Sequence, residues 1–170
     1  MKRRTLLGAA LLLPLEGLAQ TCGVITPRQT EGPFFSPNSP KRISLVEKAS
    51  KAARLVVTGQ VLSPQCQPVP NALLDFWHSD EAGAYDNQGF RYRGHQFADA
   101  QGRYRLETIV PAEYPGRARH IHVKVQAPGG RILTTQLYFP GDRRDSLYRP
   151  ELEVRRVKGE ETRFDFVVAA

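Results

Sequence analysis

The chain has 170 residues, 41% of them hydrophobic, and a formal net charge of +7, which corresponds to about one domain able to bury a core. This composition excludes a disordered tail, and no apolar run approaches the roughly 20 residues that a membrane-spanning helix needs. The basic residues are scattered rather than gathered on one helix, which argues against nucleic-acid binding.

Residues 1–19 have the organisation of a signal peptide. The basic start Lys2-Arg3-Arg4 precedes a short apolar stretch over residues 5–15, and small residues precede a cleavage site at Gln20. The adjacent arginines resemble a twin-arginine signal. A buried N-terminal helix is the alternative, but Pro14 and the basic start disfavour it. We expect an exported protein of the periplasm or extracellular space, with no membrane association after signal removal.

The two cysteines, Cys22 and Cys66, are interpreted in the light of export. An oxidising compartment favours a disulfide between them, which would remove unfolded-state entropy worth about 3–4 kcal/mol. Two separate buried thiols are the alternative. A cysteine metal site is not expected, because neither Cys has a second Cys or a His at ligand spacing.

Residues 20–53 show little periodicity and several prolines, which predicts a long N-terminal arm. Within it, only Leu45–Ala53 has a weakly helical pattern. From residue 54 to residue 170, short apolar or alternating runs are separated by turn signals. The expected strands are Leu55–Leu62, Ala72–His78, Gly102–Ile109, His120–Gln126, Arg131–Phe139 and Arg163–Val168. With no long helix between them, they predict an all-β fold, an antiparallel β-sandwich with long loops. Pro128-Gly129-Gly130 predicts a hairpin.

His120-Ile121-His122 lies inside one of these expected strands. Residues two apart project from the same face of a strand, so both imidazoles point one way while Ile121, Val123 and Val125 face the core. Two imidazoles on one face can hold a metal ion. From this motif alone, two polar residues on the solvated face of a sheet are an equally good interpretation.

A metal centre would need more ligands than these two histidines. His78 and His95 would complete an all-histidine copper or zinc site. A carboxylate such as Glu113 or Asp142 would instead complete a ferrous site of two histidines and one carboxylate.

Tyrosine oxygens are the third option. Tyr85 lies in a glycine-bearing turn after an expected strand, and Tyr114 lies between Pro111 and Pro115, just before His120. A free tyrosine has a pKa of about 10, so it binds a metal only where a strongly charged cation displaces its proton. Ferric iron does so, and anionic phenolates stabilise the ferric state in return. Two histidines and two tyrosines therefore make a ferric site by charge.

Two longer stretches resemble the intradiol ring-cleavage dioxygenases, non-haem ferric enzymes that include the catechol and protocatechuate 3,4-dioxygenases. They are Asp75–Tyr85 (DFWHSDEAGAY) and Gly102–His122 (GRYRLETIVPAEYPGRARHIH). Thr134–Asp142 (TTQLYFPGD) and Thr30–Phe34 (TEGPF) are also similar to that family, and the resemblance covers about residues 22–142. The two cysteine positions are most similar to the exported, single-domain members.

The resemblance implies a set of iron ligands. Tyr85 and Tyr114 match the two tyrosinate ligands of Fe(III), and Tyr114 matches the one that dissociates when substrate binds. His120 and His122 match the two histidine ligands. Residues 54–170 would then form the catalytic domain.

The resemblance also implies roles around the substrate. Arg117 matches an arginine that stabilises negative charge on the substrate ring; the alternative is a surface arginine like its neighbour Arg119. Gln136, after a one-residue gap in the match, corresponds to a glutamine just outside the ligands. Thr30–Phe34 would line the approach to the iron. The loop after Tyr114 is shorter than in the protocatechuate enzymes, which leaves the identity of the catechol open.

The implied reaction is cleavage of a catechol-type aromatic by O2 to a cis,cis-muconate-type diacid, a step in the catabolism of aromatic compounds. The sequence shows no counterpart of the helical dimerisation region of the catechol enzymes, but the family often assembles, so a homo-oligomer stays open. Two other functions compete. One is a non-catalytic exported β-sandwich binding module, and the other is a copper or zinc enzyme that uses His78 and His95.

Overall fold

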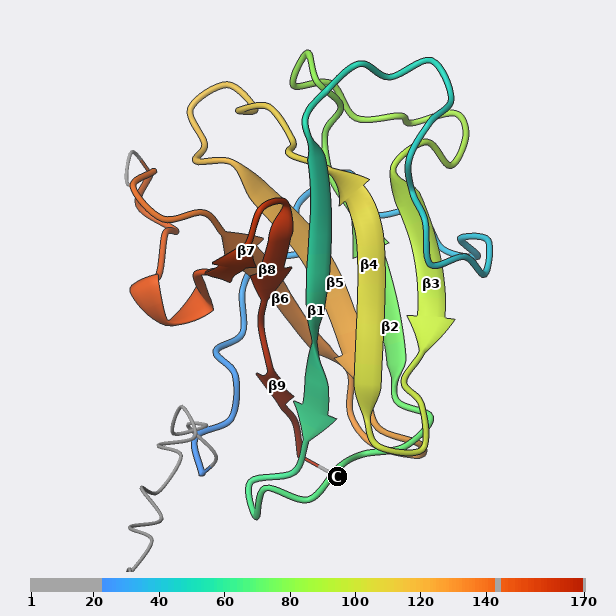
Figure 1. Cartoon of the computed structure of the whole chain (residues 1–170), viewed down its shortest axis with the longest axis vertical. Helices are drawn as coiled ribbons and strands as arrows, with labels where there is room; N and C mark the ends of the chain where they lie inside the picture. The colour runs from blue at the N-terminus through green and yellow to red at the C-terminus, as the bar shows by residue number, and fades with distance from the viewer. Residues whose placement is uncertain (1–22, 143–144, 170) are drawn as a thin grey trace, which may run out of the picture.

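A computed structural model of the protein describes residues 23–142 and 145–169, which form two sheets packed face to face (Figure 1). The predicted all-β sandwich is confirmed. The predicted signal peptide and Cys22 lie outside the described residues, so export and the Cys22–Cys66 disulfide stay predictions. Within the described part of the chain, no helix is long and apolar enough to cross a membrane.

One sheet has the strand order β4-β1-β8-β7, with β9 also paired to β1, and the other has the order β3-β2-β5-β6. The strands are β1 (Arg54–Leu62), β2 (Leu73–Trp77), β3 (Arg93–Phe97), β4 (Arg103–Ile109), β5 (His120–Gln126), β6 (Leu133–Tyr138), β7 (Arg155–Lys158), β8 (Glu161–Arg163) and β9 (Phe166–Val167), with a 3-10 turn η1 (Pro150–Leu152) before β7. The second sheet is antiparallel throughout, whereas β8 and β9 run parallel to β1.

Alternating apolar residues build the core between the sheets. Ile121, Val123 and Val125 on β5 are fully buried, and so are Val57 and Val61 on β1. Burying a side chain of this kind contributes about 1.5–3 kcal/mol relative to leaving it exposed. Because one face of β5 is committed to the core, its histidines are committed to the opposite face.

Several elements differ from the sequence-based expectation. The single expected strand Arg163–Val168 is divided into the end of β8 (Glu161–Arg163) and β9 (Phe166–Val167). β3 and β7 were not predicted: β7 is exposed along its whole length, and β3 has no apolar alternation. The weakly helical stretch Leu45–Ala53 contains no helix. The backbone at Leu45 instead pairs with β4, its N–H donating to the Glu107 carbonyl at 2.8 Å, and the Leu45 side chain is buried in the core.

The arm crosses the outer face of the β3-β2-β5-β6 sheet. Its crossing starts beside β6, where the Gln29 N–H donates to the Thr134 carbonyl at 2.9 Å, and reaches β3, where the His95 N–H donates to the Pro40 carbonyl at 3.0 Å. In Figure 1 this blue trace passes behind the sheet. The arm therefore covers the face that carries the two histidines.

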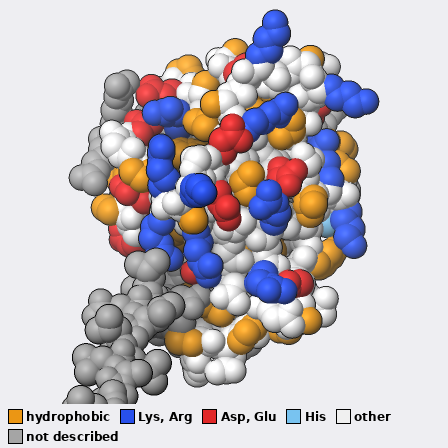
Figure 2. Space-filling model, in the orientation of Figure 1, with side chains coloured by type: hydrophobic (Ala, Val, Ile, Leu, Met, Phe, Trp, Pro, Cys, Tyr) orange, Lys and Arg blue, Asp and Glu red, His pale blue; other side chains and the backbone are white. Residues whose placement is uncertain are grey.

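The opposite sheet presents a surface of mixed charge (Figure 2). Arg103 pairs with Asp99 at 2.8 Å, and Arg105 pairs with Glu107 at 3.0 Å. On this face the basic excess of the chain is interspersed with carboxylates rather than gathered into a patch of one sign.

Candidate metal centre

Strand register places four side chains in one row across the outer face of the β3-β2-β5-β6 sheet. Trp77 is opposite Arg93 on one side and His122 on the other, and His122 is opposite Gln136. Residues directly opposite each other share a face, so all four project toward the arm. His120 and its partner Tyr138 form the neighbouring row. The sheet therefore supplies a rigid platform for any chemistry on this face.

The two histidines on this platform meet at their outer nitrogens. His120 Nε2 lies 3.0 Å from His122 Nε2, and His120 Nδ1 lies 2.6 Å from the Ala118 carbonyl. The His120 Nδ1–H must donate to that carbonyl, which leaves Nε2 with a free lone pair. Both side chains are buried, contrary to the interpretation as residues on a solvated face.

Burial keeps the imidazoles neutral, as metal ligands must be. It lowers the pKa of His120 to about 4 against the opposing hydrogen bond to Ala118. Burial, together with the neighbouring His120, also lowers the pKa of His122 well below its ordinary value. His122 Nδ1 has no hydrogen-bond partner in the described part of the chain, so its proton can sit on Nε2 and be donated to His120 Nε2, or sit on Nδ1 and leave the Nε2 lone pair for a cation.

Tyr85 brings an oxygen to the same point, with its hydroxyl 3.2 Å from His120 Nε2. Its loop is a tight turn in which the Asp80 carboxylate accepts the N–H groups of Ala82 and Ala84, both at 2.9 Å. Gly83 has φ +81°, and a Cβ there would collide with the Glu113 carbonyl. Only glycine fits, so this loop is shaped to pack against the loop that carries Tyr114.

Tyr114 lies beside Tyr85, with the ring centroids 5.9 Å apart and the rings edge to face. Two hydrogen bonds join the loops: the Ala112 N–H donates to the Asp80 carbonyl at 3.1 Å, and the Ser79 hydroxyl donates to the Ala112 carbonyl at 2.9 Å. The structure thus brings all four predicted ligands together, the histidines by register and the tyrosines by contact between loops.

The arm closes the centre from above. The Phe34 ring stacks on Tyr85 with centroids 4.5 Å apart and meets the edge of Tyr114 at 5.3 Å. A Cβ on Gly32 would lie 3.6 Å from Cε1 of His122, so the arm backbone passes directly over this ring. Trp77 stacks on the same His122 ring at 4.8 Å and 6°. The predicted role of Thr30–Phe34 as a lining segment agrees with this placement.

Arg117 and Gln136 form a polar network at the edge of the centre. Arg117 Nη2 donates to Gln136 Oε1 at 2.7 Å, and Arg117 Nε donates to Asp145 at 2.9 Å. The Tyr138 hydroxyl donates to the same Gln136 oxygen at 2.7 Å. Arg117 is therefore held in place by an ion pair that is largely buried, unlike a free surface arginine.

Four residues of this region were not among the site residues predicted from the sequence: Trp77, Tyr138, Asp145 and Arg93. Trp77 and Tyr138 contact the histidines, Asp145 fixes Arg117, and Arg93 is in the row of His122. The alternating pattern of β2 and β6 could have indicated the first two, but no local pattern indicates the other two.

The competing ligand sets do not assemble. Both ring nitrogens of His78 have protein partners, Thr108 Oγ1 at 2.6 Å and the Ser79 carbonyl at 2.7 Å, and His95 faces Ser39. Over residues 23–142 and 145–169, no three His, Cys, Asp or Glu side chains gather closely enough to share a metal ion. Among the described residues, a third donor reaches the two neighbouring histidines only when tyrosine is counted, as Tyr85.

The geometry of the donors fits a metal ion. With bonds of about 2.1 Å, two ligands at right angles lie about 3.0 Å apart, close to the observed 3.0 and 3.2 Å. Burial raises the pKa of Tyr85 above its ordinary value, against the opposing charges of Arg117 and Arg93. A highly charged cation is therefore needed to ionise Tyr85. Fe(III) is a cation with enough charge to do so.

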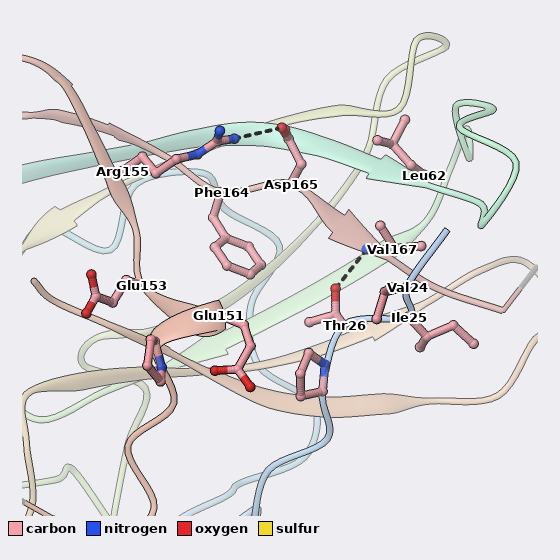
Figure 3. Close-up of a pocket in the computed structure, with 12 residues that line it drawn as sticks. Val24, Ile25, Thr26, Leu62, Glu151, Glu153, Arg155, Phe164, Asp165 and Val167 are labelled. Atoms are coloured by element: carbon pink, nitrogen blue, oxygen red, sulfur yellow. Dashed lines mark hydrogen bonds and ion pairs between the residues drawn. The ribbon is translucent and has the colours of Figure 1, made fainter. Parts of the chain in front are cut away.

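A groove of about 500 Å³ lies apart from these residues (Figure 3). The start of the arm, β9 and the η1 turn line it with Val24, Ile25, Glu151 and Val167 among others, and the Val167 N–H donates to the Thr26 hydroxyl at 2.8 Å. No histidine or tyrosine lines it, so it offers none of the ligands discussed above.

The comparisons with known proteins all find dioxygenases. A family model described as Dioxygenase matches residues 30–150. The chain is 30% identical over 146 residues to catechol 1,2-dioxygenase of Acinetobacter guillouiae, covering 69% of this chain and 48% of that protein. It is 38% identical over 107 residues to the protocatechuate 3,4-dioxygenase beta chain of Burkholderia cepacia, covering 52% of this chain and 46% of that protein.

A solved structure is more similar still. The dioxygenase domain of a dioxygenase–carbohydrate-binding protein fusion from Streptomyces sp. SirexAA-E is 52% identical with a TM-score of 0.82, covering 86% of this chain and 99% of that one. By contrast, the chain spans about half the length of the curated relatives that it matches.

Proposed function

Because the chain belongs to the intradiol dioxygenase family, we propose that it is a non-haem ferric enzyme that uses O2 to cleave the ring of a catechol-type aromatic to a cis,cis-muconate-type diacid. One observation carries the proposal: His120 Nε2 lies 3.2 Å from the Tyr85 hydroxyl and 3.0 Å from His122 Nε2, with the Tyr114 ring beside Tyr85.

Tyr85, Tyr114, His120 and His122 would hold Fe(III). When bound, the ferric ion supplies a Lewis acid that draws electron density from a catecholate, so that the ring can react with O2. Neutral imidazoles on a sheet keep two positions fixed, and the Phe34 ring covers the Tyr85 ring.

Tyr114 is suited to leave its position when substrate arrives. Its side chain is half-buried, and it begins a turn closed by the Arg117 N–H, which donates to the Tyr114 carbonyl at 2.8 Å. This turn contains Gly116 at φ +77° with open space around its Cα. The Tyr114 phenolate oxygen would accept one of the two protons that a catechol releases on becoming a dianion, and solvent hydroxide would accept the other.

Arg117 would stabilise the negative charge that develops on the ring. Its guanidinium is oriented in advance by Asp145 and Gln136, so no reorganisation is needed during reaction, which is the condition for strong electrostatic stabilisation. Trp77 covers the His122 ring and Phe34 covers the Tyr85 ring, and these two aromatic side chains would help to exclude water from the centre.

Three further statements belong to the same proposal. The signal-like residues 1–19 support export to the periplasm or extracellular space, and export supports a Cys22–Cys66 disulfide. Relatives carry names that include catechol, chlorocatechol, hydroxyquinol and protocatechuate dioxygenases, so the substrate is a catechol whose ring substituents are left open. A homo-oligomer is left open as well.

Oxygen uptake with a panel of catechols tests the proposal. We expect iron-loaded protein to be coloured by tyrosinate-to-iron charge transfer and to consume one O2 per catechol, with the ultraviolet spectrum of an intradiol product. Tyr85→Phe should lose both colour and turnover. A colourless protein with no uptake on any catechol, in which His120→Ala leaves aromatic binding unchanged, would instead establish a binding module. Stoichiometric copper or zinc in the purified protein would instead favour the copper or zinc enzyme that uses His78 and His95.

A further inference from the structure

Arg93 is a buried cation in the same row of the sheet as Trp77 and His122. It lies on β3, and only 2% of its surface is exposed. Among the described residues, no carboxylate lies within ion-pair distance of its guanidinium, although a buried charge ordinarily needs such a partner. The neighbouring Asp86 carboxylate turns away and accepts the N–H groups of Gln88, Gly89 and Arg91 instead.

Every donor contact of this guanidinium goes to a backbone carbonyl beside the metal centre. Nε and Nη2 both donate to the Asp86 carbonyl, at 2.9 and 2.7 Å, and Nη1 donates to the Phe34 carbonyl at 2.5 Å. Asp86 directly follows Tyr85, and Phe34 carries the ring that stacks on Tyr85. One side chain therefore joins the arm to the loop of the first tyrosine.

The base of Arg93 is as firmly placed as its tip. Its Cα is opposite Trp77, which is opposite His122, so the three residues stand in one row of the sheet. The Arg42 side chain also donates to the Arg93 carbonyl at 2.9 Å. The Arg93 side chain thus connects the arm and the Tyr85 loop to the sheet that carries the histidines.

We infer that Arg93 is a positioning residue of the metal centre: it ties the Phe34 and Asp86 carbonyls together and so fixes Tyr85 and its covering ring relative to the histidine pair. Arginine suits this task because its planar fork donates several hydrogen bonds in a fixed geometry, whereas lysine offers a single point of charge. The inference rests on the proposed function only in naming Tyr85 as a ligand.

The first test uses metal-free protein, so that it does not depend on iron or turnover. We expect amide hydrogen exchange of residues 30–36 and 84–90 to be at least tenfold faster in Arg93→Met, with peptides of β1 and β4 unchanged. Arg105→Met, an exposed arginine on the other sheet, is the matched control and should change neither segment. Unchanged protection of both segments in Arg93→Met would overturn the inference.

Two measurements keep the test decisive if Arg93→Met does not fold. Arg93→Lys should accelerate exchange in the same two segments, though less, and equal protection there would count against the inference. In the wild-type protein, the Arg93 Nε–H proton should be protected from exchange in NMR spectra. If this proton exchanged as fast as those of exposed arginines, Arg93 would not hold the Phe34 and Asp86 carbonyls together, and the inference would be refuted.

A spectroscopic readout then separates positioning from general stability. In iron-loaded protein we expect Arg93→Lys to shift the tyrosinate charge-transfer band and to lose iron to a chelator about tenfold faster than Arg105→Met. An unshifted band with unchanged iron release would overturn the role at the metal centre. If the wild-type protein itself shows neither colour nor oxygen uptake, the proposed function fails, while the exchange data still decide whether Arg93 ties arm to loop.

Discussion

The two halves of the candidate metal centre are held by different kinds of structure. His120 and His122 stand on β5, an inner strand whose pairing with β2 and β6 fixes their positions. Tyr85 and Tyr114 stand on loops, whose positions depend on a few hydrogen bonds between residues 79–84 and 111–117. The difference suits the proposed chemistry, in which both histidines would remain bound while Tyr114 would leave.

The comparison predicts where substitution is most damaging. Replacing His122 by Ala should abolish iron binding and reduce activity by more than the 10–100-fold typical of losing a residue that merely supports a ligand. The fold should persist, because the core face of β5 is untouched. Metal analysis and oxygen uptake measure the effect, with circular dichroism as the control for folding. An iron content equal to wild type would remove His122 from the ligand set.

The second prediction concerns His78, at the junction between β2 and the Tyr85 loop. There the stability of the fold should depend on pH. His78 directly follows β2, and burial lowers its pKa to about 4 from the ordinary 6.5. Below about pH 6.5 the unfolded chain takes up a proton there that the folded chain does not, so stability falls as the pH drops from 6.5 to 4 and levels off below. The expected loss is about 3 kcal/mol, or about 100-fold in the folding equilibrium.

Urea unfolding of metal-free protein at pH 7, 5 and 4 measures this loss. His78→Gln keeps hydrogen-bonding capacity toward Thr108 and the Ser79 carbonyl but does not titrate, so its stability should fall less over the same range. The difference between the two curves isolates His78 from the other histidines and the carboxylates. Parallel curves for the two proteins would show that His78 does not contribute.

The contact between the tyrosine loops can be tested at a single glycine. Gly83→Ala adds a Cβ that collides with the Glu113 carbonyl at a φ of +81°, so the two loops must separate. We expect about 10–100-fold weaker retention of iron against a chelator. Gly129→Ala is the matched control, since it has a similar φ of +71° in open space at the β5–β6 turn. It should cost some stability but leave iron binding unchanged.

What could be predicted from the sequence alone also differs between the strand-borne histidines and the loop-borne tyrosines. The β5 alternation predicted which residues face the core and that both imidazoles share a face, because a strand has a period of two wherever one face is buried. The hairpin at Pro128-Gly129-Gly130 was predicted equally well and is confirmed between β5 and β6. The residue pattern of a single strand or turn is therefore enough to predict which way its side chains face.

The placement of the two tyrosine loops next to each other could not be predicted from such a pattern. Tyr85 and Tyr114 were proposed as ligands from charge and from a family resemblance, not from any pattern that brings their loops together. Arg93 and Asp145 were missed because each acts on a distant partner through its side chain, and neither lies in an apolar repeat. β3 escaped prediction for a related reason, since its buried positions include Arg93, Gly94 and Gln96 rather than apolar residues.

The smallest expected effect concerns the arm that covers both halves. Phe34→Leu keeps an apolar side chain of similar reach but removes the stack on Tyr85 and the edge contact with Tyr114. Such aromatic pairs contribute about 0.5–1.5 kcal/mol beyond the area they bury, so we expect a change of a few-fold to about tenfold in the KM for catechol. Iron content should stay at the wild-type level, because the histidine pair and the Tyr85 turn are untouched. Phe97→Leu, at an exposed position on β3, is the control and should alter neither value. A loss of iron in Phe34→Leu would mean that the arm holds the tyrosine ligand itself, and the division between fixed strands and adjustable loops would then have to include the arm.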